Sequence, residues 1–523
     1  MKGGDKMVWH ILKKDWKLTW PMVLAVAAIH VLLRLTLYES YPFGQPRLAS
    51  LRDLLMVGCY FGSAFLIVSV VQQDAIPGVR QDWLVRPILR RDLLLAKILF
   101  VVLLVQAPMV VADAFESLLY GFSPGQSLAA AFSRGTVLLF FFGLAMLVFA
   151  SLTRNLTEAI VGGSLVFVGG ALVITLAQDM RGGGSLELWV QFSGLSWIEQ
   201  LERMLLTVLI AIAVLSLQYF RRETVPSRWI FGTAAVLWVM IFFTPWQPAF
   251  AVQKWTSPNP GSADSVAVAF AAELGRSSAT PDIGEGNLRV RTSEATMFVS
   301  LPLRITGLPN DSVLKADHYN VRVILNRGEA LNAGAGDDLA AFHEGSAKAA
   351  KEIYQTIRVP ANTYDRIKDR PVQLEIDYSL TLMKLTGAYG IPALQGDQRT
   401  PELGWCKTRV NEERTAVQLR CIRPGNRPDC STSFLENAAT GQRNPARSSC
   451  SSNYSPFVAW WMDAMTRFAV NSPFRDATGL AHYPVDGSQV GDTRLIVRVY
   501  RPEDHFTRRV MIPSIRLSEW AAR

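Results

Sequence analysis

Long apolar runs fill the first half of the chain, whereas apolar and polar residues alternate through much of the second half. A helix needs roughly 20 apolar residues to cross a bilayer. Seven runs approach that length, at residues 21–37, 54–71, 93–113, 135–153, 159–177, 204–220 and 229–247. The pattern therefore predicts an α-helical membrane bundle of about seven spans over residues 21–248.

The first 20 residues show a separate, amphipathic pattern. At about 100° per residue, basic residues gather on one helix face and tryptophans on the opposite face. The residues are Lys6, Lys13 and Lys17, and Trp9, Trp16 and Trp20. This composition is typical of a helix in the interface of an anionic leaflet. We expect residues 1–20 to lie on the lipid bilayer; an ordinary solvated leader is the alternative.

After residue 248 the apolar period changes from helical to two. The clearest run extends from Val372 to Leu382, where Val, Leu, Ile and Tyr alternate with Gln, Glu, Asp, Ser and Thr. Several such runs are separated by turn-rich segments. They predict a mainly antiparallel, β-sandwich-like soluble domain over residues 249–523.

Charge gives the expected orientation of the chain. The 523 residues carry a formal net charge of +9, and Lys and Arg in short loops favour the cytoplasmic side. With the N-terminus inside, the inner loops carry 14 Lys and Arg and the outer loops carry five. We therefore expect a bacterial inner (plasma) membrane protein with a cytoplasmic N-terminus and a periplasmic or extracellular C-terminal domain. The basic balance reflects this topology and predicts no nucleic-acid partner.

Four cysteines fall in the part expected outside: Cys406, Cys421, Cys430 and Cys450. Four cysteines in an oxidising compartment fit two disulfides, with three possible pairings. We favour Cys406–Cys421, which face each other if a tight turn occupies Glu413-Arg414, together with Cys430–Cys450. A zinc site is the rival interpretation. However, the chain has no Cys-x-x-Cys and its six histidines are scattered, so we expect no metal.

The usual catalytic motifs are missing from the sequence. It contains no Gly-x-x-x-x-Gly-Lys-[Ser/Thr] phosphate loop, no Gly-x-Ser-x-Gly and no His-Glu-x-x-His. The polar residues within the spans form no motif that would support a membrane-embedded enzyme; they are His30, Arg34, Gln106, Asp113 and Glu158. Arg34, near a span end, can reach the headgroups. We expect neither catalytic residues nor a directly bound cofactor.

The segment between the second and third spans is unusually charged. Residues 74–97 hold five basic and three acidic residues. Trp83 can provide a buried anchor for a partner, with Asp82, Arg86 and Arg90 as an ionic rim. We expect a docking surface on the membrane face. A solvated loop that binds only lipid headgroups is the alternative.

This segment resembles the membrane subunits of ABC transporters, in particular the type-two exporter permeases. In that family the second span is followed by an acidic residue, a short helix, a Pro-hydrophobic-x-Arg segment and a lysine that opens the third span. Here those positions read Asp74, residues 80–85, Pro87-Ile88-Leu89-Arg90 and Lys97. The resemblance implies a coupling helix in a groove of a separate ATPase, with these contact residues: Asp74, Arg80, Asp82, Trp83, Arg86, Pro87, Arg90 and Lys97.

The resemblance covers residues 6–220. The basic N-terminal helix is similar to the elbow helix of the family, and the polar turn Thr153-Arg154-Asn155 also fits. The chain departs from the family at Asp74, where Glu is commoner, and at Leu89, where Ser or Thr precedes the arginine. A seventh span and a large outer domain are further departures.

The resemblance implies a permease subunit of an ABC-type transporter, an exporter that forms the translocation path. A cytoplasmic ABC ATPase subunit would use the ATP, and a second permease copy or paralogue would complete the path. The substrate stays open. The alternative is a membrane-anchored extracytoplasmic binding or sensing protein with no transport activity.

Overall fold

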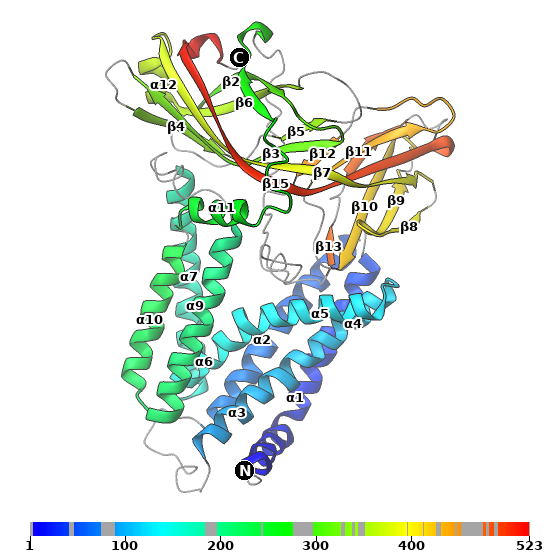
Figure 1. The fold of residues 1–523 in the computed structure, drawn as a ribbon. Helices are drawn as coiled ribbons and strands as arrows, with labels where there is room; N and C mark the ends of the chain where they lie inside the picture. Colours follow the sequence, from blue (N-terminus) through cyan, green and yellow to red (C-terminus); the bar gives the residue numbers. More distant parts are fainter. Residues whose placement is uncertain are drawn as a thin grey trace.

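The computed structural model has two parts, a helical N-terminal half and a β-rich C-terminal half (Figure 1). It describes residues 4–40, 46–74, 89–183, 196–241, 244–275, 296–325, 330–336, 340–343, 351–394, 396–411, 413–424, 430–444, 447–450, 474–476, 481–485 and 490–521. The N-terminus and the β-domain lie at opposite ends of the helical part (Figure 1).

The helical part contains these elements: α1 (Gly4–Ser40), α2 (Pro46–Gln72), α3 (Arg90–Phe100), a π-helical turn (Val101–Gln106), α4 (Ala107–Leu119), α5 (Pro124–Leu138), a second π-helical turn (Leu139–Gly143), α6 (Leu144–Leu152), α7 (Leu156–Gly183), α9 (Ser196–Ser216), a third π-helical turn (Leu217–Arg221), α10 (Thr224–Met240) and α11 (Trp246–Trp255). The first two π-helical turns join helices into longer rods, whereas the third ends at the left-handed residue Arg222. The first rod is α3–α4 and the second is α5–α6.

Five segments of the described chain are long and apolar enough to cross a membrane: Lys6–Thr36, Ser50–Gln72, Arg90–Leu119, Pro124–Leu152 and Leu201–Arg221. The other two predicted spans coincide with α7 and α10. Only 15 described residues of α7, Leu156–Gly170, count as an apolar helix, and α10 has 17 residues. A helical membrane-type bundle is therefore confirmed, whereas the number seven is not.

The predicted interfacial helix and the predicted first span form one continuous helix, α1. Pro21 lies inside it and does not end it, although proline lacks the N–H that the helix ladder uses. The reason is tertiary: Ile11 and Leu12 before Pro21 and Val23 and Val26 after it enter the same hydrophobic core. Packing on both sides of the proline holds the helix together.

The C-terminal half is antiparallel, as the alternation predicts, and its described strands form three sheets. One sheet has the order β1-β2-β6, another β13-β10-β9-β8 with β14 on β10, and the largest β12-β11-β15-β7-β3-β4 with β5 on β3. The strands are β1 (Ala267–Phe270), β2 (Thr296–Thr306), β3 (Ser312–Ile324), β4 (Ala330–Gly336), β5 (Ala340–His343), β6 (Lys351–Pro360), β7 (Val372–Pro392), β8 (Asp397–Thr400), β9 (Gly404–Val410), β10 (Ala416–Pro424), β11 (Cys430–Asn437), β12 (Arg447–Cys450), β13 (Phe474–Asp476), β14 (Ala481–Pro484) and β15 (Thr493–Ile515); a short helix, α12 (Ala361–Ile367), follows β6.

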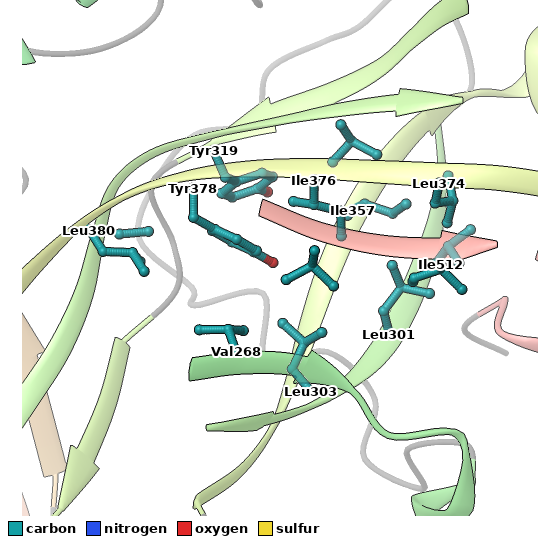
Figure 2. Close-up of a cluster of buried hydrophobic side chains, with 14 of the residues drawn as sticks. Val268, Leu301, Leu303, Tyr319, Ile357, Leu374, Ile376, Tyr378, Leu380 and Ile512 are labelled. Carbon is teal, nitrogen blue, oxygen red and sulfur yellow. The ribbon is translucent and has the colours of Figure 1, made fainter. Parts of the chain in front are cut away.

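Two long strands, β7 and β15, pair along almost their whole length and give the domain two cores. In the first core, the β1-β2-β6 sheet packs on one end of the pair, where Leu301 and Leu303 meet Leu374 and Ile376 (Figure 2). Fully burying such a side chain contributes about 2 kcal/mol relative to leaving it exposed. In the second core, the β8-β9-β10 strands pack on the opposite end of the pair.

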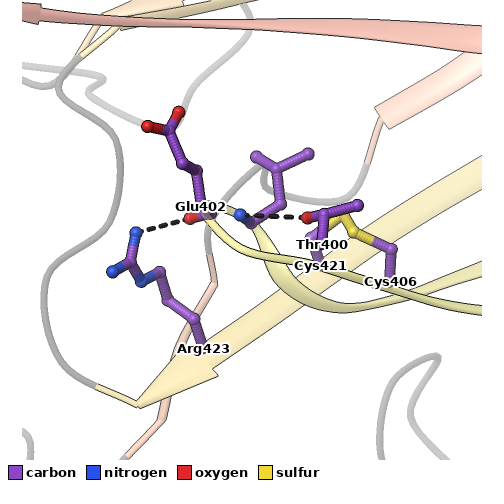
Figure 3. Close-up of a disulfide and its surroundings, with 6 residues drawn as sticks. Thr400, Glu402, Cys406, Cys421 and Arg423 are labelled. Atoms are coloured by element: carbon purple, nitrogen blue, oxygen red, sulfur yellow. Dashed lines mark hydrogen bonds between the residues drawn. A yellow bond between two sulfur atoms is a disulfide. The ribbon is translucent and has the colours of Figure 1, made fainter. Parts of the chain in front are cut away.

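Two disulfides join neighbouring strands of the β-domain. Cys406 of β9 is bonded to Cys421 of β10 (Figure 3), and Cys430 of β11 to Cys450 of β12. These are the pairs that the sequence led us to favour. The β9–β10 connection turns where we expected it, with Arg414 at a positive φ of 54°.

The helix α11 lies between the helical part and the β-domain (Figure 1). The indole of Trp246 stacks on the ring of His318, with centroids 4.1 Å apart. Behind this contact, the sheet buries the side chains of Asp317, Thr381 and His505. The hydroxyl of Thr381 lies 2.7 Å from Nδ1 of His505. The predicted outer domain is thus attached to the bundle through a packed joint.

Candidate functional site at the ends of the first three helices

Lys97 is the centre of a buried ion network that links α1, α2 and α3. Its Nζ lies 2.9 Å from Oδ2 of Asp15 and 2.7 Å from Oδ2 of Asp74. Nζ also donates to the backbone oxygen of Val70 at 2.8 Å. Lys14 completes the network, with Nζ 3.0 Å from Oδ1 of Asp74. Two lysines therefore compensate two aspartates.

The helix ends explain why the lysine is placed there. Val70 is in the last turn of α2, where backbone oxygens lack a partner within the helix. A cation at this end also interacts favourably with the helix dipole. Lys97 satisfies both conditions from the first turns of the α3–α4 rod, because its Nζ reaches the end of α2. Its three N–H donors match its three oxygen partners.

Asp74 sits between the buried lysine and the partly exposed one. Burial favours the protonated form of its carboxyl, but the positive charges of Lys97 and Lys14 outweigh this effect. As a result the pKa of Asp74 lies below its usual value. Asp74 is therefore ionised at neutral pH, and it is the last described residue before residues 75–88.

Further polar contacts tie neighbouring turns to this site. Nε2 of Gln72, at the end of α2, donates to Oγ1 of Thr153 at 2.9 Å, which places the predicted polar turn Thr153-Arg154-Asn155 beside the end of α2. Asn155 accepts from the backbone N–H of Glu158 at 2.8 Å and so caps α7. Arg90, at the start of α3, donates to the backbone oxygen of Phe220.

The structure brings together some of the residues expected for ATPase coupling and leaves the others undetermined. Asp74 and Lys97 are in direct contact, and Arg90 lies at the start of the same helix as Lys97. The remaining expected contact residues lie outside the described part of the chain: Arg80, Asp82, Trp83, Arg86 and Pro87. The described network thus borders both ends of the expected docking segment.

The six residues expected at the membrane interface all have exposed side chains: Lys6, Trp9, Lys13, Trp16, Lys17 and Trp20. The lysines and the tryptophans surround a narrower stripe that packs on the bundle. This stripe consists of Ile11, Leu12, Asp15 and Thr19.

Sequence reasoning missed Asp15. The spacing held a signal, because Asp15 follows Ile11 by four residues and precedes Thr19 by four. An acidic residue in the centre of a buried helical stripe requires a cation on a neighbouring element. Lys97 is that cation.

A second buried network joins α1, α4 and α5 further along the rods. Nε of Arg34 lies 2.7 Å from Oδ1 of Asp113, and its Nη1 lies 3.5 Å from Oε2 of Glu116. Arg134 pairs with Oδ2 of the same Asp113. All four side chains are at most 3% exposed. The expectation that Arg34 reaches the headgroups is therefore wrong, because two carboxylates inside the helical part hold it.

In both networks, the pairing of opposite charges positions neighbouring helices. Among the described residues, no group of three or more His, Cys, Asp or Glu is placed to hold a metal ion. The networks consist of carboxylates and cations that fix helices against each other. No protein-family model matches the chain, and no curated protein matches it.

Proposed function

We propose that the chain is the permease subunit of an ABC-type transporter, an exporter driven by a separate ATPase that docks on residues 74–97. The observation that carries this proposal is the contact between Asp74 and Lys97. These residues flank the expected docking segment on both sides, and Asp15 and Lys14 tie them to α1. A push on the segment would therefore reach three helices at once.

The arrangement of the two halves supports the proposed topology. The N-terminus and the β-domain lie at opposite ends of the helical part (Figure 1). If α7 and α10 also cross the membrane, the chain has seven spans, and the Lys and Arg bias puts the N-terminus in the cytoplasm. The disulfides then lie in the oxidising compartment where such bonds persist.

The proposal assigns the energy source to a partner. The sequence has no phosphate loop of its own, so a cytoplasmic ABC ATPase subunit binds and hydrolyses ATP. A second copy of this permease, or a paralogue, completes the translocation path.

The test is co-purification of the full chain with candidate cytosolic ABC ATPases in lipid nanodiscs, followed by measurement of ATP hydrolysis. We expect the chain to stimulate hydrolysis, and Arg86→Ala to reduce the stimulation at limiting ATPase concentration by removing a rim charge that favours association. Arg52→Ala is the matched control, because Arg52 is a half-exposed arginine paired with Asp53 elsewhere on the bundle. It should leave the stimulation unchanged.

The proposal fails if no ATPase binds and if Asp82→Ala and Arg86→Ala leave the cellular phenotype of the chain intact. Removal of residues 256–523 separates it from the anchored-receptor alternative. A permease lacking this domain retains ATPase binding. A receptor held by an inert anchor binds no ATPase even when intact, and it loses its function when the domain is removed.

A further inference from the structure

The loop that connects α4 to α5 contacts the β-domain directly. The rings of Tyr120 and Trp405 lie 5.4 Å apart between centroids, and Phe122 and Ile422 belong to the same apolar cluster. Nη2 of Arg399 donates to the backbone oxygen of Tyr120 at 3.0 Å. The α4–α5 hairpin therefore carries the part of the β-domain formed by β8, β9 and β10.

The loop is built for close approach. Gly121 has a positive φ of 74°, a region that other residues rarely adopt. A Cβ at this position would overlap the guanidinium of Arg399. Only glycine allows both the turn and the contact with the β-domain.

The strands that the loop contacts, β9 and β10, are joined by a disulfide next to the contact. Trp405 pairs with Ile422 in the β9–β10 register, and the next pair along is Cys406 with Cys421, which are disulfide-bonded (Figure 3). Arg423, adjacent to Ile422, donates to the backbone oxygen of Glu402. The contact residues thus belong to a cross-linked strand pair that moves as one piece.

The second ion network connects this hairpin to α1. Asp113 on α4 forms ion pairs with both Arg34 on α1 and Arg134 on α5. Because all three charges are buried, separating the helices would leave unpaired charges in an apolar environment, which is strongly unfavourable. At its other end, α1 carries Lys14 and Asp15 of the first network.

We propose that α1 and the α4–α5 hairpin form one rigid unit that transmits displacement from the Asp74–Lys97 contact to the β8–β10 part of the β-domain. Arg34 and Asp113 are the positioning residues that fasten α1 to the hairpin. This inference deepens the proposed function and rests on it for its driving force. It makes the outer domain a driven part of the transporter instead of a passive receptor.

The link can be tested in the full chain without any ATPase, by hydrogen exchange in nanodiscs. Lys97→Met disturbs the first network, and we expect exchange in residues 404–424 to change about threefold or more. In an Arg34→Met background, the same Lys97→Met change should leave residues 404–424 unaffected, because the fastening is already broken. This double-mutant design isolates the coupling from the effects of each single variant.

Two controls keep the test specific. Arg52→Met removes a half-exposed arginine and should not alter exchange in residues 404–424. Strands β2 and β6 at the far end of the β-domain (Figure 1) should exchange at the same rate in all variants. Arg399→Met removes the hydrogen bond to the backbone oxygen of Tyr120 and should reduce the response to Lys97→Met.

The outcomes distinguish this inference from the proposed function. If Lys97→Met changes exchange in residues 404–424 equally with and without Arg34, or does not change it at all, the rigid unit is refuted whether or not an ATPase binds. If the response depends on Arg34 and Arg399 but no ATPase co-purifies, the transmission stands and the ABC assignment fails. With a bound ATPase, addition of ATP and vanadate should replace Lys97→Met as the trigger.

Discussion

The two ion networks of the helical part have the same composition by residue type and different construction. Each contains two basic and two acidic residues. The network at the first helix ends is built from lysines, and one of them, Lys14, keeps 37% of its side chain exposed. The network further along is built from arginines, and no member exceeds 3% exposure.

The difference in chemistry matches a difference in role. A lysine ammonium is a compact charge on a flexible stem, whereas an arginine guanidinium is a rigid fork with five donors. Lys97 holds three partners from one point and can follow small movements of the α2 end. Arg34 and Arg134 fix Asp113 from two directions. The first network suits a contact that can adjust to small displacements, and the second a permanent fastening.

The largest expected effect is at the centre of the arginine network. Asp113→Ala leaves two buried guanidinium groups with only Glu116, and we expect a loss of about 3–5 kcal/mol in unfolding free energy. Denaturant unfolding in detergent measures it. Asp53→Ala removes an exposed, arginine-paired aspartate and should change stability by less than about 0.5 kcal/mol. Similar losses for both variants would contradict the role of burial.

Replacing Lys97, the central residue of the first network, should cost less unfolding free energy than replacing Asp113. Lys97→Met leaves Asp15 and Asp74 buried, but Lys14 still lies 3.0 Å from Asp74 and 3.5 Å from Asp15. We therefore expect a loss of about 2 kcal/mol in the same measurement. A loss as large as that of Asp113→Ala would show that the two networks do not differ in rigidity.

Sequence patterns predicted most of the fold because both halves follow simple periods. Apolar runs located the five membrane-type segments, and alternation from Val372 to Leu382 predicted β7. The count of seven spans was not confirmed, because apolar length alone does not determine where a helix such as α10 stops. The continuity of α1 through Pro21 was not predicted, since packing on both sides of the proline is a tertiary effect that local patterns do not contain.

The site was predictable in part. The resemblance singled out Asp74 and Lys97 as contacts of an ATPase, which stays a prediction; that they contact each other, 2.7 Å apart, was not foreseen. Asp15 and the Arg34–Asp113 pair were missed, because a helical pattern gives the face of a residue and not its neighbour on another helix. A buried charge implies that a partner of opposite charge lies nearby. Which helix supplies this partner depends on the tertiary fold.

A third buried cluster, formed by His318 and its neighbours at the α11 joint, should make the stability of the protein depend on pH. Burial lowers the pKa of His318 to about 4, against an opposing effect of Asp317. The folded state therefore resists protonation that the unfolded state accepts, so stability falls as pH drops from about 6.5 toward 4. Between pH 7 and pH 5 we expect a loss of about 2 kcal/mol, measured by unfolding at both values.

His318→Phe is the matched variant for this prediction, because phenylalanine keeps a ring against Trp246 and cannot be protonated. The pH dependence should flatten by about the same 2 kcal/mol. Asp317 does not obscure the result: burial acts to raise its pKa, but Lys315 and hydrogen bonds lower it to about 2, so it stays ionised throughout. An unchanged pH dependence in His318→Phe would assign the effect to another group.

The smallest effect is expected at Lys14, and it tests the comparison most directly. Lys14 and Lys97 approach Asp74 at nearly equal distances, 3.0 and 2.7 Å, but only Lys97 is fully buried. Water screens the Lys14 pair and competes for its charge, so Lys14→Met should cost only about 0.5 kcal/mol. The cost should shrink further in 1 M salt, whereas that of Lys97→Met should not. If Lys14→Met instead costs as much as Lys97→Met, distance and not burial determines how much each ion pair stabilises the protein. The contrast between the partly exposed first network and the buried second network would then not hold.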